Sequence, residues 1–218
     1  MGKVALILSG CGYLDGSEIH ESVLCMLHLA RYHHEVQCFA PDNHQVKIMN
    51  HLTQHQDNGA SRNALIEAAR IARGHILSLE KLKVEDFDAC LMPGGMGSIL
   101  QFSDFEQKGV DCTVDPKLKE IFMAFYQAKK PIGATCIAPI ILAKIFEGIV
   151  SIKMTLGSSS FYQNILNQLG MKGEIAKASD CVMDKEHLVY TTPCYMEPEN
   201  LVSLSIGIEN LIKNFLNG

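Results

Sequence analysis

Short apolar runs that end at glycine, proline or a small polar residue alternate with longer segments of helical spacing. Four such runs occur: Val4–Leu8, Val36–Ala40, Asp88–Met92 and Ile132–Thr135. Runs of this length are typical of strands buried on both faces. The segments 18–32, 61–73 and 116–130 carry helix spacing or helix start and stop signals. The alternation predicts an α/β fold, a three-layer sandwich with a mostly parallel sheet covered on both faces.

The later part of the chain has a different pattern. We expect a strand at Val150–Leu156, a helix at Phe161–Leu169 and a closing helix at Glu199–Leu216. Two short runs, Cys181–Met183 and Leu188–Thr192, flank polar residues and predict a hairpin. Residues 43–60 are polar without a clear period, and we expect an irregular surface excursion there.

Size and charge limit the classes of protein. With 218 residues, of which 47% are hydrophobic and 20% charged, the chain predicts one globular domain over residues 1–218. The formal net charge of −5 argues against nucleic acid or an anionic membrane as partner, because both select basic surfaces. No apolar run has the length of a membrane span and the first residues do not resemble a signal peptide, so we predict a cytoplasmic location.

Cys136 lies in the most specific local motif of the chain, a predicted junction of strand, turn and helix. A strand stops at this cysteine, the small residues Ala134 and Ala138 flank it, and Pro139 suits the first turn of a helix. A nucleophile elbow needs small residues at those positions. A helix start also lowers the pKa of a thiol, so we expect Cys136 to be exposed and reactive. A buried structural cysteine is the alternative, and it is our interpretation of the other seven cysteines, which we expect to be free thiols.

Ligands in parallel sheets bind at the carboxyl ends of strands, so the segments 9–12, 93–97 and 135–139 are expected to face one crevice. Gly94 and Gly95 allow backbone N–H groups to point into it, as an oxyanion hole or a phosphate cradle, although a plain turn is also possible. Cys11, Gly94 and Glu18 are expected to line the same crevice. Neither glycine-rich segment fits a nucleotide motif, and we expect no cofactor.

Ionisable residues of the first helical turn, His20 and Glu21, open on that crevice. A carboxyl group beside the Cys136 thiol either takes its proton or, if burial keeps it protonated, donates a hydrogen bond to the thiolate. Ordinary helix-start chemistry is the alternative. A metal held by His20, Glu21, Cys11 and Cys136 is a further alternative, but the spacing is not that of the H-E-x-x-H pair and we expect no metal.

Many blocks along the chain together resemble one family. They are Ser9-Gly-Cys-Gly12, Asp15-Gly-Ser-Glu-Ile-His-Glu21, Cys38-Phe-Ala-Pro-Asp42, Asn50-His-Leu-Thr53, Ser61-Arg-Asn63, Glu67-Ala-Ala-Arg-Ile-Ala-Arg-Gly74, Pro93-Gly-Gly95, Cys136-Ile-Ala-Pro139 and Thr191-Thr-Pro193. The chain is identified by them as similar to the ElbB family, named for enhancing lycopene biosynthesis, whose eukaryotic members are the ES-one proteins. ElbB-like proteins belong to the class I glutamine amidotransferase-like superfamily together with PfpI proteases and the Parkinsonism-associated deglycase.

The resemblance implies a flavodoxin-like sandwich, often a homodimer, with weak glutathione-independent glyoxalase activity that turns glyoxal into glycolate, or deglycase activity. It also implies a link to isoprenoid biosynthesis. Carried over to this chain, Cys136 is the nucleophile, Glu21 is the acid that contacts the thiol, and the N–H groups of Gly95 and Ile137 form the oxyanion hole.

The chain departs from the superfamily's enzymes at the histidine partner. Ile137 follows Cys136 where PfpI proteases have histidine, and residues 153–158 contain none. Glu21 or His20 has to substitute as proton carrier. Three hypotheses follow: a glyoxalase-type lyase that acts on a small dicarbonyl or other small electrophile, a non-catalytic redox or metabolite sensor acting through Cys136, and an ammonia-supplying glutaminase, which the missing histidine disfavours.

Overall fold

The computed structural model describes residues 2–197 and 200–215 and contains a seven-stranded sheet with strand order β10-β11-β7-β6-β1-β2-β5. The strands are β1 Lys3–Ile7, β2 Glu35–Ala40, β5 Ile76–Ser78, β6 Ala89–Met92, β7 Ile132–Thr135, β10 Val182–Asp184 and β11 Val189–Thr192. Neighbouring strands of this sheet pair in parallel except β10 and β11, which form the predicted antiparallel hairpin. The predicted flavodoxin-like α/β fold is confirmed.

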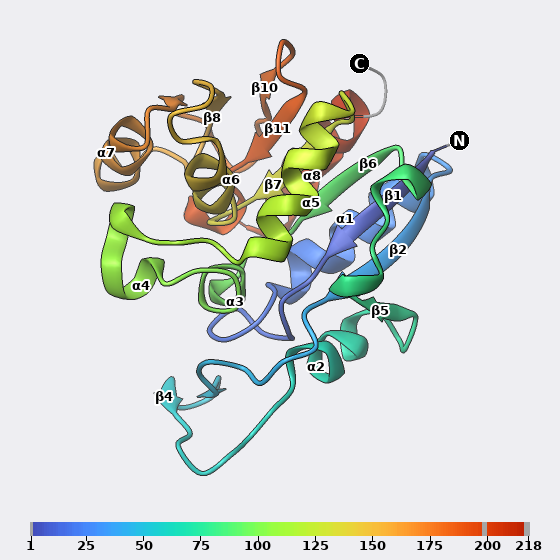
Figure 1. Ribbon diagram of the computed structural model, residues 1–218, viewed down its shortest axis with the longest axis vertical. Helices are drawn as coiled ribbons and strands as arrows, with labels where there is room; N and C mark the ends of the chain where they lie inside the picture. The colour runs from blue at the N-terminus through green and yellow to red at the C-terminus, as the bar shows by residue number, and fades with distance from the viewer. Residues whose placement is uncertain (1, 198–199, 216–218) are drawn as a thin grey trace.

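Helices cover both faces of this sheet (Figure 1). They are α1 Ile19–Arg31, α2 Ala64–Ile71, α3 Met96–Leu100, α4 Phe105–Lys108, α5 Pro116–Gln127, α6 Pro139–Phe146, α7 Ser160–Gln168 and α8 Leu201–Phe215, with short 3₁₀ turns at Leu79–Lys81, Val84–Asp86, Gly109–Asp111 and Cys194–Met196 (η4). Helix α1 packs against α8 on one face, and α5 packs against α6 on the other. No helix among the described residues is long and apolar enough to cross a bilayer.

The central strands form the core and position the loops that follow them. Val4–Ile7 of β1 and Ala89–Met92 of β6 are completely buried, and the burial of each large aliphatic side chain stabilises the fold by about 1.5 to 3 kcal/mol. Leu6 of β1 pairs with Leu91 of β6, and Met92 of β6 pairs with Ala134 of β7. The carboxyl ends of these three strands therefore lie at one edge of the sheet, and the loops after them meet there.

The predicted strand at 150–156 is wrong in extent. Only Lys153–Met154 (β8) forms a strand, and it pairs with Lys172–Gly173 (β9) in a separate small sheet. The Lys153 N–H donates to Asp184 Oδ2 and the Thr155 N–H donates to Thr191 Oγ1. Because side-chain oxygens of β10 and β11 take these two donors, this segment forms no backbone ladder with the seven-stranded sheet.

Smaller differences concern the segment 41–78. Asn63, not Ser61, caps α2, because its Oδ1 accepts the Ile66 N–H at 3.0 Å. The irregular excursion contains a small hairpin whose strands have two residues each, β3 Met49–Asn50 and β4 His55–Gln56. The edge strand β5 has three residues, which is too short for an apolar pattern, and the sequence did not predict it. The closing helix is α8, while residues 199 and 216 of its predicted range lie outside the described residues.

Candidate functional site

The predicted strand–turn–helix junction is present at Cys136. The residue follows β7 directly, has a φ of 57°, and donates its N–H to Thr192 O at 2.9 Å. A positive φ is uncommon for a residue with a Cβ, and it turns the thiol off the line of the strand. Gly94 makes room for this turn, since a Cβ there would lie 2.4 Å from Cys136 Cβ. The local sequence thus aims one thiol into the space above the strand ends.

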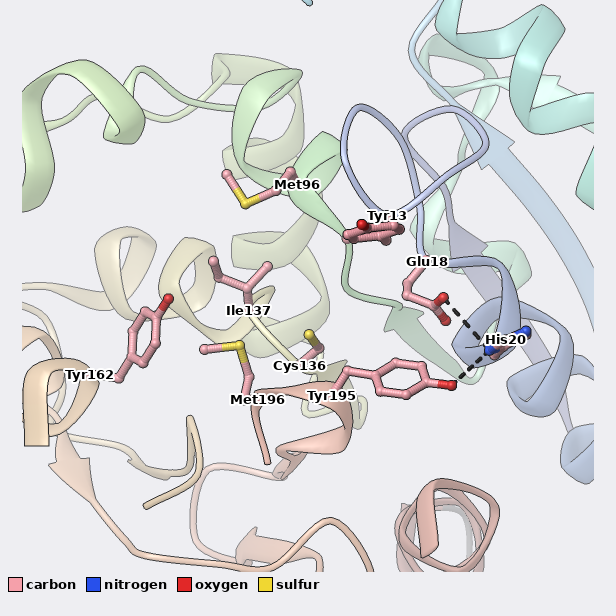
Figure 2. A pocket seen from close by; sticks show the side chains of 10 residues that line it. Tyr13, Glu18, His20, Met96, Cys136, Ile137, Tyr162, Tyr195 and Met196 are labelled. Atoms are coloured by element: carbon pink, nitrogen blue, oxygen red, sulfur yellow. Dashed lines mark hydrogen bonds and ion pairs between the residues drawn. The ribbon is translucent and has the colours of Figure 1, made fainter. Parts of the chain in front are cut away.

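The Cys136 side chain is less accessible than the sequence predicts. It is 8% exposed and lies in a cavity wall (Figure 2). Burial raises the pKa of its thiol well above the usual range, the nearby carboxylate of Glu21 raises it further, and the N–H groups of Gly95 and Ile137 act in the opposite direction. The predicted low pKa and high exposure are therefore wrong, because desolvation and a neighbouring anion outweigh the helix start.

Glu21 lies in the first turn of α1 and is completely buried. Its Oε2 accepts hydrogen bonds from the Gly94 N–H at 2.9 Å and from the Thr135 hydroxyl at 2.5 Å. Burial raises the pKa of Glu21 to about 7, and the Glu18 charge adds to this, while the bonds from Thr135, Gly94 and Cys136 reduce the rise. The sequence analysis missed Thr135, although its position directly before the nucleophile was the available signal.

The Cys136 thiol and the Glu21 carboxyl form a coupled pair. A hydrogen bond between them favours the charged carboxylate and the neutral thiol. The other oxygen, Glu21 Oε1, is buried and has no further polar partner among the described residues. The two groups therefore share a hydrogen-bonded proton, and this proton lies on the sulfur while Glu21 is ionised, because the pKa of Glu21 is about 7 and that of the Cys136 thiol is raised well above its usual range.

The cavity has a volume of about 500 Å³. Its lining residues are Tyr13, Glu18, His20, Gly95, Met96, Cys136, Ile137, Tyr162, Tyr195 and Met196. Figure 2 shows His20 between the carboxylate of Glu18 and the hydroxyl of Tyr195. His20 Nδ1 lies 2.7 Å from Tyr195 Oη and 4.0 Å from Glu18 Oε1, and Glu18 Oε2 caps α1 by accepting the Glu21 N–H. Of the residues predicted by the sequence, Glu18, His20, Gly95, Cys136 and Ile137 line one space.

The predicted lining residue Cys11 lies elsewhere. It is not among the lining residues, and the charges that act on its half-buried thiol are those of Glu67, Arg70, Asp15 and Arg62, toward α2. The loop after β1 turns back through glycines with positive φ, and this directs Cys11 away from the cavity. Gly94 lies behind the cavity, where it binds Glu21.

The proposed ligands for a metal are not brought together, because Cys11 is separated from the other three. Within residues 2–197 and 200–215, no group of three or more His, Cys, Asp or Glu side chains is arranged to hold a metal ion. The groups available for chemistry at the described site are a thiol, the proton that it shares with Glu21, two backbone N–H donors at the sulfur, and a histidine at the opening.

The sequence analysis missed the three tyrosines and two methionines of the cavity. Tyr195 and Met196 come from η4, Tyr162 from α7 and Met96 from the start of α3. The glycine-rich motif at residues 93–97 was the one signal that pointed to Met96. Tyr162, Tyr195 and Met196 depend on how η4 and α7 pack, which no local pattern reveals, whereas Tyr13 directly follows the segment 9–12 that was expected to face the crevice.

Comparison with known proteins places the chain among established relatives. The chain is 38% identical to the human mitochondrial glutamine amidotransferase-like class 1 domain-containing protein 3 over 98% of this chain and 82% of that protein. It is 28% identical to the mitochondrial ES1 protein of Danio rerio, the zebrafish, over 98% of this chain and 85% of that protein. These relatives confirm the resemblance to the ES-one proteins.

Solved structures also resemble this chain. An isoprenoid biosynthesis protein with an amidotransferase-like domain from Ehrlichia chaffeensis superposes with a TM-score of 0.93 at 34% identity, over 99% of this chain and 98% of that one. Drosophila melanogaster DJ-1beta has a TM-score of 0.53 at 17% identity, over 99% and 98% of the two chains, which is a likeness of fold alone. The DJ-1/PfpI family model matches residues 5–194. The chain therefore belongs to the DJ-1/PfpI family.

Proposed function

We propose that this protein is a cysteine-dependent lyase with weak, glutathione-independent glyoxalase activity that converts glyoxal into glycolate, or with a deglycase-type reaction on related adducts. The observation that carries the proposal is the coupled pair of Cys136 and Glu21 at a ligand-sized cavity. A thiol that shares a proton with a carboxyl of pKa about 7 has its acid and its base ready near neutral pH.

The first step joins the thiol to the substrate. The Cys136 sulfur bonds to one aldehyde carbon of glyoxal, the carbonyl electron pair moves to oxygen, and that oxygen takes the proton shared with Glu21. The product is a hemithioacetal beside a Glu21 carboxylate. The N–H groups of Gly95 and Ile137, which already act on the sulfur, are suited to stabilise the developing oxyanion.

The next steps move a proton between the two carbons. Glu21 removes the C–H proton of the hemithioacetal carbon and returns a proton to the neighbouring carbon, while the hydroxyl proton passes to the other oxygen. One carbon is thereby oxidised to a thioester and the other reduced to an alcohol, without an external oxidant. Water then cleaves the thioester, which releases glycolate and restores the Cys136 thiol.

His20 is the second candidate for proton transfer. Its ring lines the cavity and is half-exposed, and its Nδ1 is occupied by the Tyr195 hydroxyl. We assign Glu21 the transfer between carbons because it is coupled to the sulfur, and we assign His20 with Tyr195 the delivery of the hydrolytic water and exchange of protons with solvent.

Glyoxal turnover by pure protein tests the proposal. We expect glycolate formation by the wild-type protein and none by Cys136→Ser, and an undiminished rate in that variant would refute it. Turnover in D₂O sharpens the test, because deuterium from solvent at the alcohol carbon of glycolate would show that the proton passes through an exchangeable group such as Glu21. An unlabelled product, formed by Glu21→Gln at an undiminished rate, would show a direct hydride shift in which Glu21 has no role.

A non-catalytic redox sensor is the second candidate function. The observation in its favour is that a buried thiol with a raised pKa and no histidine at position 137 is a slow nucleophile. Peroxide would oxidise Cys136 to a sulfenate with release of water, and a second equivalent would give a sulfinate. Mass spectrometry after mild peroxide treatment tests this: selective oxidation of Cys136 together with negligible glyoxal turnover favours the sensor.

Three further expectations remain proposals. The Ehrlichia chaffeensis protein is named for isoprenoid biosynthesis, and we propose a role linked to that pathway for this chain at the level of the family. A homodimer is proposed because the family resemblance implies one, and the chain belongs to that family. The human and zebrafish relatives are named as mitochondrial, and this does not support the cytoplasmic location predicted from the sequence, which stays a prediction.

A further inference from the structure

The cavity is large for the dialdehyde of the proposed reaction. Its volume is about 500 Å³, and at about 30 Å³ per water in the liquid this space corresponds to about seventeen waters. Glyoxal has four non-hydrogen atoms and would leave most of that space filled with water. Cavities of this volume are typical of sites that enclose molecules several times larger.

Among the described residues that line the cavity, one has a formal charge, and it is negative. The Glu18 side chain is mostly buried, with 11% of it exposed, and its carboxylate faces the cavity near His20. No lysine or arginine is among the lining residues in the part of the chain that the structure describes. A phosphate or carboxylate on a ligand would therefore lose its hydration and gain no cation, while it would be repelled by Glu18.

Three tyrosines and two methionines make up half of the ten lining residues. Tyr162 stands on one side of Cys136 and Tyr195 on the other, with Met96 above (Figure 2). Burial raises the pKa of Tyr162 and the charge of a Cys136 thiolate raises it further, so the Tyr162 hydroxyl lies within electrostatic reach of the sulfur. Aromatic rings prefer aromatic partners at offset or edge-on geometry, and methionines adapt their shape to such ligands.

We propose that the site selects an uncharged electrophile with an aromatic or comparably large apolar substituent, of which an aryl-substituted α-oxoaldehyde is the representative. The reactive carbon lies at Cys136, and the substituent lies between Tyr162 and Met96. This proposal names the substrate class of the proposed function and rests on it for the reaction, but the selectivity for ligands is a property of the cavity that can be measured without turnover.

Alkylation of Cys136 by three matched reagents measures that selectivity directly. Iodoacetamide, iodoacetate and N-benzyl iodoacetamide all form a bond between sulfur and carbon and release iodide, and peptide mass spectrometry reports the rate at Cys136. Each rate is divided by that of glutathione as a free reference thiol. We expect the benzyl reagent to be favoured over iodoacetamide by about tenfold and iodoacetate to be disfavoured by about tenfold. Ratios equal to those of glutathione would overturn the proposal.

Two variants assign the selectivity to residues. Tyr162→Ala should remove most of the preference for the benzyl reagent, while Tyr162→Phe, which keeps the ring, should retain it. Glu18→Gln should raise the ratio of iodoacetate to iodoacetamide, and this ratio does not depend on how much thiolate Cys136 forms. If neither ratio changes in these variants, the cavity walls do not select the ligand and the proposal fails.

Turnover separates this proposal from the proposed function. The hydration of phenylglyoxal to mandelate should have a kcat/KM above that of glyoxal to glycolate, and glyoxylate, an anion, should be a poor substrate. Selective alkylation without turnover of either aldehyde would refute the lyase reaction and leave the ligand class standing. Turnover of glyoxal that exceeds that of phenylglyoxal, with unselective alkylation, would refute the ligand class and leave the lyase.

Discussion

The back of the cavity and its opening are built differently. At the back, Glu21, Thr135 and Gly94 are buried together, and each polar contact joins the end of a central strand to the first turn of α1. At the opening, Tyr195 and His20 are partly exposed and their contact joins a short 3₁₀ turn to a helix start. The back therefore has one arrangement fixed by the sheet, whereas the opening consists of side chains that can adjust.

This difference assigns separate tasks to the two regions. The fixed back holds the thiol, its proton and the backbone donors in a buried place, where electrostatic effects are strong. The adjustable opening decides which molecules reach the sulfur. Substitutions at the back should accordingly abolish chemistry, and substitutions at the opening should change rates by small factors.

Glu21→Gln should have the largest effect on turnover. The amide keeps the size of the side chain and can still accept from Gly94, but it cannot take or return a proton. General acid–base catalysis contributes about 10² to 10⁴ in rate, so we expect glycolate formation to fall by about that factor. The check is kcat/KM for glyoxal; a loss smaller than tenfold would show that the back does not carry the proton transfer.

The pH dependence of stability tests the same carboxyl without substrate. Folding raises the pKa of Glu21 from 4.5 to about 7, so the folded state disfavours the charge. The group costs no stability below about pH 4.5, and its cost grows as the pH rises and is complete above about pH 7. Relative to Glu21→Gln, the free energy of unfolding of the wild type should fall by about 2 to 3 kcal/mol between about pH 5 and about pH 8. Urea unfolding measures this, and a constant difference would contradict it.

Gly94→Ala should disturb the back by geometry alone. The new Cβ would lie 2.4 Å from Cys136 Cβ and 2.9 Å from Glu21 Oε2, so both groups have to shift. We expect a loss of about 1 to 3 kcal/mol in stability and about a hundredfold in turnover, since a displacement near 1 Å is enough for that. Gly59→Ala is the matched control, because its Cβ would meet only Asp57 Oδ1 at 3.6 Å. Equal behaviour of the two variants would contradict the packing described.

Tyr195→Phe should have the smallest effect. It removes the hydroxyl that contacts His20 Nδ1 at 2.7 Å in an exposed position, where such a bond contributes about 1 kcal/mol or less. We expect turnover to fall by about two- to fivefold and stability to change by less than about 0.5 kcal/mol. A loss as large as that of Glu21→Gln would show that the opening, not the back, performs the chemistry.

The same division explains what the sequence could predict. The strands that form the back are continuous apolar runs, and the residues after them follow from the rule that parallel strands end at one edge. Cys136, Glu21 and Gly95 were found in this way or through the resemblance. The environment of the thiol was not, because its pKa depends on the desolvation of two groups from distant segments, and no local pattern records how deeply they are buried.

There is also a physical reason why the residues at the opening could not be predicted. Tyr162 and Tyr195 reach the cavity through α7 and η4, whose positions depend on side-chain contacts such as the Thr155 N–H with Thr191. The prediction for Cys11 was wrong in the opposite sense, because the sequence placed this residue in the cavity and the structure does not. Like Cys136, it follows a central strand. The glycines beside it turn the loop back, and Cys11 faces α2 instead.

Cys136 and Cys11 therefore provide the most direct test of the account. Each follows the end of a central strand, but only Cys136 lines the cavity. Glycolate formation from glyoxal should be compared in the wild type, Cys136→Ser and Cys11→Ser, with thermal unfolding to confirm that all three fold. The account predicts no glycolate from Cys136→Ser and an almost unchanged rate from Cys11→Ser. Equal rates in the two variants, whether both are active or both inactive, would contradict it.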